Sequence, residues 1–297
     1  MSKQMVLEGL RCRGARADEA MVIGRIIDGA FKHEKRTGHL LVKNFDKLED
    51  IRVAYRVQDG VEELLGVCPI RHYPCHFGPT TLKAGGLSMV GVLPKYQKKG
   101  IGQFLLGCAE KYLSKEGFDV GLLFSGSPTF YQHQNWEVAV DHYFHTINAG
   151  SIPLDLDELG GLSLEARKLR ESDFPAINEL YENFNKDRVL TKVRDQAWWD
   201  KHHQRYTQES NPYYCFFNHS SLVAYVRVHP RVTGFTGAYL GKKTNDAYLT
   251  EYAIEPSIPV KEQRSIVEYL LAWLKDFAMQ RVISLISTPL PDAYPLV

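Results

Sequence analysis

The sequence predicts an α/β fold (α+β by some schemes) made of two similar units, each a mixed central sheet flanked by helices. Strand-like runs alternate with segments whose apolar residues recur at helical spacing. The same order of elements appears twice along the chain, although the letters differ. The length of 297 residues suits two domains at roughly 100–200 residues each.

The first half begins with a helix and a group of strands. The stretch 14–31 has helical spacing, and the runs 51–58, 64–73 and 85–94 have the composition of strands. The buried face of this first helix is expected to carry Met21, Ile23, Ile26, Ile27 and Phe31.

A second helix is predicted over 100–117, followed by an apolar strand at 118–124 and a short helix within 125–137. The short helix is entered through Ser127 and Pro128, and proline suits the first turn of a helix. The face of the helix at 100–117 that is expected to be buried carries Ile101, Phe104, Leu105, Cys108 and Tyr112.

Turn and linker residues gather over 145–163, so we place the domain boundary at residue 150, which gives domains 1–150 and 151–297. The second half then predicts a strand and helix over 165–184 and a hairpin over 215–228. A helix over 195–206 is predicted between these two, and a strand over 247–254, a helix over 261–279 and a closing strand over 281–288 follow the hairpin.

Composition is that of an ordinary globular protein, with 44% hydrophobic and 24% charged residues. The net charge of +1 gives no global field for nucleic acid or an anionic membrane, so neither is expected as a partner. The five cysteines are odd in number and widely spaced, which argues against a disulfide framework or zinc ribbon. Without a recognisable signal peptide or apolar span, we expect a cytoplasmic protein.

The most informative stretch, 90–103, is a strand that runs into a glycine-bearing loop and opens an amphipathic helix. Backbone N–H groups at a helix N-terminus have no partner within the helix, and the helix dipole adds positive potential. This geometry suits a pyrophosphate. No Asp or Glu occurs from Leu64 to Ala109. The cations within and beside this stretch are Arg71, Lys83, Lys95, Lys98 and Lys99.

A short G-x-G is weak evidence alone, because a tight turn explains it equally well. A Walker A loop is excluded because G-x-x-x-x-G-K-[ST] is absent, and the dinucleotide fingerprint fails because Leu105 stands in the third glycine position. In the second half no glycine follows Gly241, so one cofactor loop is expected and not two.

Val92-x-Pro94 followed by Gln97-x-x-Gly100-x-Gly102 resembles the acetyl-coenzyme A (acetyl-CoA) loop, Q/R-x-x-G-x-G/A, of the GNAT acetyltransferases. Downstream, 122–137 resembles that family's F-Y-x-x-x-G-F/W-E segment, with Asn135 in place of glycine. Asn tolerates the left-handed conformation that the turn needs. The pattern is similar to the Eis-like tandem subgroup, without its sterol-carrier-like C-terminal domain.

The resemblance implies an N-acetyltransferase that moves an acetyl group from acetyl-CoA, or another acyl-CoA, to a primary amine by direct attack. It implies no metal, a small-molecule or peptide amine acceptor, and Tyr131 as general acid. The residues that the resemblance assigns to the acyl-CoA are Val90, Gly91, Val92, Gln97, Lys98, Lys99, Gly100, Ile101, Gly102, Gln103, Gly126 and Ser127.

The general base stays open. The central strand lacks the glutamate that some relatives place there, so a water chain is favoured, with the carboxylate of Val297 as the alternative that Eis-like relatives suggest; His33 and Glu34 are weaker candidates. The missing glutamate also favours a rival interpretation, a non-catalytic acyl-CoA-binding or sensing protein. Assembly into a homo-oligomer and the identity of the amine stay open too.

Overall fold

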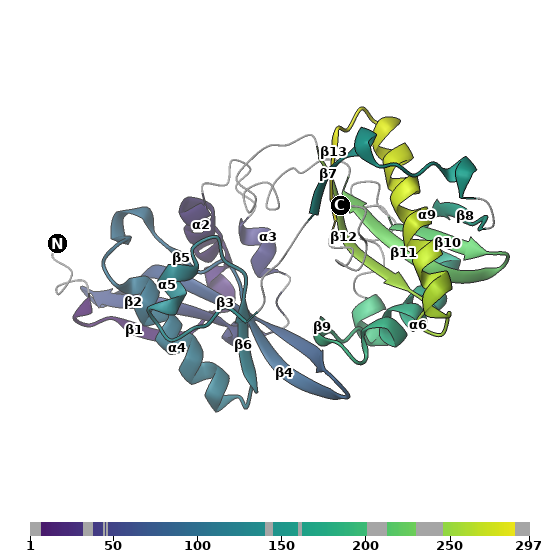
Figure 1. Ribbon diagram of the computed structural model, residues 1–297. Helices are drawn as coiled ribbons and strands as arrows, with labels where there is room; N and C mark the ends of the chain where they lie inside the picture. The colour runs from purple at the N-terminus through teal and green to yellow at the C-terminus, as the bar shows by residue number, and fades with distance from the viewer. Residues whose placement is uncertain are drawn as a thin grey trace. The chain divides into compact units, whose positions relative to one another are not determined.

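The computed structural model describes residues 7–31, 38–43, 45, 47–139, 145–159, 162–200, 213–229 and 246–288. The chain divides into two compact units, Met1–Val138 and Ala139–Val297 (Figure 1). The boundary expected at residue 150 is therefore too late, because β7 (His145–Asn148) pairs with β13 (Leu285–Thr288) in the sheet of the second unit. No helix in the described part of the chain is long and apolar enough to cross a membrane.

The first unit is built on a mixed sheet with strand order β1-β2-β3-β4-β6, and β5 pairs with β3. Its neighbours are antiparallel except β4 and β6, which run parallel because α4 connects them. The strands are β1 (Arg11–Gly14), β2 (Ile51–Gln58), β3 (Val61–Phe77), β4 (Thr80–Leu87), β5 (Gly91–Val92) and β6 (Val120–Leu123).

Two helices cover the two faces of this sheet. Successive strand residues point to opposite faces, so β3 sends Val67 toward α2 (Ala20–Phe31) and Cys68 toward α4 (Ile101–Lys115). Two short helices, α3 (Gly38–Val42) and α5 (Pro128–Gln132), complete the unit.

The helical spacing predicted α2 and α4, but some residues expected on their buried faces are partly exposed. Met21 and Phe31 of α2 are 54% and 41% exposed, whereas Ile23, Ile26 and Ile27 on the face toward the sheet are buried. On α4 the buried stripe is Ile101, Leu105, Leu106, Ala109 and Leu113. Phe104, Cys108 and Tyr112 are half-buried at its margin.

The second unit has a six-stranded sheet of order β7-β13-β12-β11-β10-β8, with β12 and β13 parallel. On β10, Phe216 packs with α9 (Val260–Met279) and Cys215 packs with α6 (Phe174–Asn185), so the two helices lie on opposite faces (Figure 1). The other strands of this sheet are β8 (Glu165–Lys168), β10 (Tyr213–Asn218), β11 (Ser221–His229) and β12 (Asp246–Ile254), and a short strand, β9 (Val189–Lys192), is not part of it. Short 3-10 helices lie at Ala17–Glu19, Leu48–Asp50, Pro94–Tyr96, Ala149–Ser151, Leu156–Glu158 and Glu171–Asp173.

Both units start with the same polar corner. In the first unit Arg13 donates to Glu19 (2.9 Å), which also accepts from the backbone N–H of Arg16 (2.8 Å). In the second unit Arg167 donates to Asp173 (2.6 Å), which accepts from the N–H of Arg170 (2.7 Å). The sequence pattern R-x-x-R-x-x-acid therefore occurs in both units with the same hydrogen bonds. The order of predicted elements alone did not reveal this repeat.

Candidate active site in the first unit

An extra residue interrupts the sheet where β4 gives way to β5. Leu87 pairs with Ile70 and Gly91 with Val67, so three intervening residues on this strand (88–90) face two on β3 (68–69). This is a β-bulge, and Met89 within it has a left-handed φ of 48°. A bulge leaves a residue without its ladder partner and bends the strand. Val90, Gly91 and Val92 follow directly.

The loop that joins β5 to α4 turns sharply back on itself. The Gln97 side-chain amide donates to the carbonyl of Val92 (3.2 Å). Lys98 and Gly100 then take left-handed φ values of 60° and 89°. Glycine adopts that conformation freely, whereas a lysine there costs on the order of 1 kcal/mol, so the fold holds Lys98 against its preference.

The first turn of α4 is open to an anion. Gly100 is the N-cap and offers no side-chain hydrogen bond to the helix. The first N–H groups of a helix, here those of Ile101, Gly102 and Gln103, have no partner within the helix. Together with the helix dipole they form donors suited to a phosphate.

Gly102 has a second role that the sequence did not reveal. A Cβ atom at Gly102 would lie 3.1 Å from Cζ of Phe130, so the absent side chain leaves room for this ring of α5. Gly126 has open space around it, and the N–H of Ser127 donates to Oγ of Ser125 (2.9 Å) at the start of α5. The loop and the segment 126–131 thus lie side by side.

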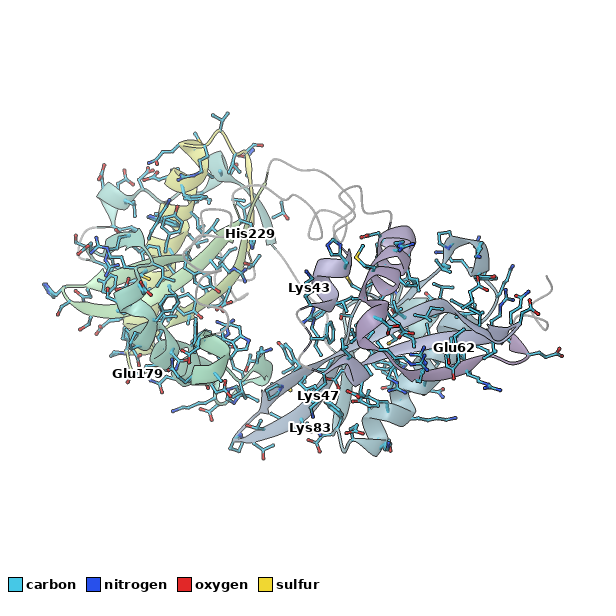
Figure 2. All side chains as sticks on the ribbon, turned by 180° about the vertical axis from the view of Figure 1, so that it is seen from behind. Lys43, Lys47, Glu62, Lys83, Glu179 and His229 are labelled. Atoms are coloured by element: carbon cyan, nitrogen blue, oxygen red, sulfur yellow. The ribbon has the colours of Figure 1, made fainter. Side chains whose placement is uncertain are left out.

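The basic patch expected around the loop is smaller in the structure. Lys83, labelled in Figure 2, donates to the carbonyl of Glu116 at the opposite end of α4. Arg71 lies over the ring of Phe45, 4.4 Å from its centroid. Lys95 is ion-paired with Glu63 (2.9 Å). Glu63 stands one residue before the acid-free stretch, so sequence position alone concealed this pairing.

Tyr131 is half-buried in an aromatic row on α5. Its ring centroid lies 5.0 Å from that of Phe130 and 6.5 Å from that of Trp136. Trp136 in turn donates to Glu110 of α4 (2.8 Å), a contact that sequence reasoning missed. Asn135 has a φ of 62°, which confirms that asparagine takes the left-handed turn expected there.

Three candidates for the general base have no place in the described part of the chain. Val297, His33 and Glu34 lie outside the described residues, so the structure assigns none of them a place. Among the described residues no group of three or more His, Cys, Asp or Glu side chains could hold a metal.

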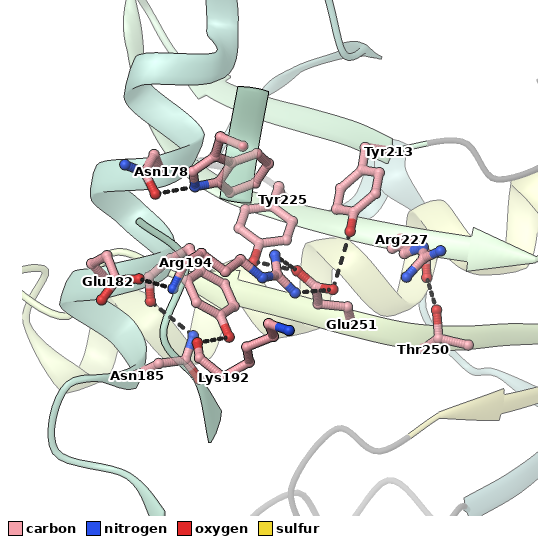
Figure 3. Close-up of polar contacts among 12 residues, drawn as sticks. Asn178, Glu182, Asn185, Lys192, Arg194, Tyr213, Tyr225, Arg227, Thr250 and Glu251 are labelled. Atoms are coloured by element: carbon pink, nitrogen blue, oxygen red, sulfur yellow. Dashed lines mark hydrogen bonds and ion pairs between the residues drawn. The ribbon is translucent and has the colours of Figure 1, made fainter. Parts of the chain in front are cut away.

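The second unit contains a buried ion pair that sequence reasoning did not identify. Arg194 makes two hydrogen bonds to Glu251 (2.7 and 2.8 Å), and the hydroxyls of Tyr213 and Tyr225 donate to the same carboxylate (Figure 3). Burial alone raises the pKa of Glu251, but the charge and hydrogen bonds of Arg194 outweigh it and the pKa is lowered. The carboxylate is saturated with donors, which is typical of a structural pair.

Residues 11–139 match the family model of the GNAT acetyltransferase domain. An uncharacterised N-acetyltransferase of Chlorobaculum tepidum is 26% identical over 132 residues, covering 44% of this chain and 78% of that protein. The match to the family model thus lies in the first unit.

Solved structures resemble both units. A GCN5-related N-acetyltransferase from Kribbella flavida superposes with a TM-score of 0.69 at 16% identity, covering 97% of this chain and 65% of that one. One from Anabaena variabilis gives 0.64 at 15% identity, covering 94% and 65%. Eis1 from Mycobacterium abscessus gives 0.60 at 17%, covering 97% and 67%. The chain thus has a GNAT-type fold over both units and spans about two thirds of the length of these structures.

Proposed function

We propose that the first unit binds acetyl-CoA, or another acyl-CoA, and transfers the acyl group to a primary amine within a ternary complex. The observation that carries this proposal is the first turn of α4, where Gly100 takes a left-handed φ of 89° and no side chain caps the helix. The family match over 11–139 supports the same interpretation.

In this proposal the cofactor pyrophosphate lies on the loop before α4. The backbone N–H groups of Ile101, Gly102 and Gln103 donate to its oxygens, and the ammonium group of Lys98 lies beside it. Lys99 donates to the carbonyl of Lys95 (3.2 Å) and leaves that carbonyl to reach the pyrophosphate. Gln97 fixes the turn through its bond to Val92. The charge of Lys95 is already neutralised by Glu63, so Lys95 contributes less.

The bulge between β4 and β5 supplies the place for the thioester arm. Val90, Gly91 and Val92 follow the bulge, and backbone groups freed from the ladder are able to bind the pantetheine amides and the thioester carbonyl. Gly126 and Ser127 line the other side of the cofactor.

The reaction needs little beyond positioning and one acid. The amine nitrogen attacks the carbonyl carbon, the C–S bond breaks, and Tyr131 gives its proton to the departing thiolate. The proton that the amine loses leaves through a water chain or to the carboxylate of Val297. A phenol with a pKa near ~10 can protonate a thiolate whose conjugate acid lies near ~8.5.

The test is coenzyme A release, followed by thiol trapping, from purified protein with acetyl-CoA and a panel of amines. The panel contains aminoglycoside, polyamine, lysine and peptide acceptors, with a reaction lacking amine as control. Amine-dependent release supports the transferase. Binding of acetyl-CoA without release from any amine would favour the sensing protein, and absence of binding would refute both.

A further inference from the structure

Two thiols from distant parts of the first unit meet beneath α4. Cys12 on β1 pairs with Ala54 of β2, which belongs to the core cluster under α4. Paired residues on neighbouring strands share a face, so Cys12 points toward the helix. Cys108 lies on α4 at the margin of its buried stripe. Each thiol is the largest influence on the pKa of the other, so the two sulfurs lie close together, and both side chains are partly exposed.

Arg52 completes this cluster. It stands on β2 opposite Gly14 of β1 and lies over the ring of Tyr112, 4.7 Å from its centroid, one helical turn beyond Cys108. One guanidinium nitrogen donates to the carbonyl of Glu49 (3.1 Å), whereas the buried Nε atom makes no hydrogen bond within the described part of the chain. The Arg52 guanidinium therefore lies next to the two thiols, and its positive charge favours the thiolate form of each.

The electrostatics separate the two cysteines into different roles. The hydrogen bond from Cys108 lowers the pKa of Cys12 to about 7 against the effect of burial, and the charges of Arg52 and Arg13 lower it further. The same hydrogen bond raises the pKa of Cys108, and burial adds to that rise. Cys12 is thus the thiolate and Cys108 the proton donor, an arrangement typical of thiol pairs that exchange disulfides.

We propose that Cys12 and Cys108 form a redox-active dithiol that low-molecular-weight disulfides, such as oxidised glutathione, convert to an intramolecular disulfide. The Cys12 thiolate attacks one sulfur of the reagent, forming a mixed disulfide and releasing one thiolate. Cys108 then loses its proton and attacks the Cys12 sulfur, which releases the second thiolate. The two protein thiols are oxidised and the reagent is reduced to two thiols, so electrons and protons balance.

The geometry and the other cysteines support this pairing. A disulfide needs sulfurs about 2.05 Å apart and Cβ atoms about 3.5–4.5 Å apart, so Cys12 on the face of β1 under α4 and Cys108 on α4 need only a local movement to form one. Cys68 and Cys215 are fully buried, and burial raises the pKa of each to about 12. Cys75 is fully buried too, and burial raises its pKa. These three are poor nucleophiles and serve as controls.

The test treats the fully reduced chain with oxidised glutathione without oxygen and measures intact mass and a peptide map. We expect the loss of two hydrogens and a cross-linked peptide containing Cys12 and Cys108. Cys108→Ser should instead retain one glutathionyl group on Cys12, and Cys12→Ser should react about tenfold more slowly. Cys75→Ser is the matched control and should behave as wild type.

A wild-type chain that stays reduced, or that keeps glutathione without closing the disulfide, would overturn the proposal. Equal reaction rates for Cys12→Ser and wild type would do the same. The wild-type mass and peptide map decide the question even where a serine variant folds poorly. The readout is independent of acyl transfer, so it stands or falls apart from the proposed function.

Discussion

At the scale of single residues, the proposed site depends on Tyr131 and on two glycines with different tasks. Gly100 supplies a left-handed turn, whereas Gly102 leaves room for Phe130. Phe130 and Trp136 flank the Tyr131 ring edge-to-face, and Trp136 is tied to α4 through Glu110. The same aromatic row thus fixes the tyrosine and the first turn of α4 relative to each other.

Tyr131→Phe keeps the ring in this row and removes only the hydroxyl. We expect kcat to fall by about 10²–10⁴-fold, the contribution of a positioned acid, while the Kd for acetyl-CoA changes by less than about twofold. Steady-state coenzyme A release and a binding titration measure both. Tyr55→Phe on β2 is the control and should leave kcat unchanged; a Tyr131→Phe enzyme with wild-type kcat would exclude the role of general acid.

At the scale of single residues, the sequence predicted the structure where residue type determines the backbone conformation. The substitution of asparagine for glycine at position 135 indicated a left-handed turn, and Asn135 has a φ of 62°. The sequence did not reveal the pairing of Lys95 with Glu63 or the room that Gly102 leaves for Phe130, because those depend on which elements meet in space.

At the scale of elements, α4 (Ile101–Lys115) links the proposed cofactor loop to the thiol pair. Helical spacing predicted that this helix exists and where it lies. Three of the residues predicted to be buried, Phe104, Cys108 and Tyr112, lie instead at the margin of its buried stripe. A helix of 3.6 residues per turn allows neighbouring stripes to look equally apolar, and contact with the sheet decides between them. The bulge before β5 had no sequence signal, since Met89 is not a residue that favours positive φ.

Two glycines of α4 provide a matched pair for a stability test. A Cβ at Gly107 would meet nothing within 4 Å, whereas Gly100 has a φ of 89°. Gly107→Ala should raise the free energy of unfolding by about 0.5–1 kcal/mol through higher helix propensity. Gly100→Ala should lower it by about 1–2 kcal/mol, because alanine resists the left-handed region. Urea denaturation distinguishes them, and equal effects of the two substitutions would contradict the loop conformation.

At the scale of the whole molecule, the chain contains two copies of one architecture with different contents. Each has a β-α-β segment that brings two strands together in parallel, β4 with β6 and β12 with β13. Each starts with the same arginine and acid corner, at Glu19 and Asp173. The order of elements predicted this repetition from sequence, but the boundary was misplaced because β7 belongs to the second sheet.

The buried pair Arg194 and Glu251 should make the second unit sensitive to acid. The folded-state pKa of Glu251 is lowered, so its contribution is complete above the unfolded value of roughly 4.3 and is lost as pH falls through the folded pKa. Glu251→Gln should cost about 3–5 kcal/mol at neutral pH, because Arg194 is left buried and unpaired, and should flatten this acid dependence.

Urea denaturation from pH 7 down to pH 3 measures both effects of Glu251→Gln. The exposed Glu262, in the first turn of α9, provides the control through Glu262→Gln, which should follow the wild-type profile. A Glu251→Gln chain with wild-type stability at neutral pH would show that the pair does not hold the second unit together.

The central claim is that α4 of the first unit carries the acyl-CoA site, and an acetyl-CoA binding titration tests it most directly. Wild type, Gly107→Ala and Tyr131→Phe should bind with the same Kd within about twofold, whereas Gly100→Ala should bind about tenfold more weakly, because its loop relaxes out of the left-handed conformation in the free chain and about 1.4 kcal/mol is needed to restore that conformation on binding. Failure of the wild type to bind acetyl-CoA, or equal affinity of Gly100→Ala, would contradict the account.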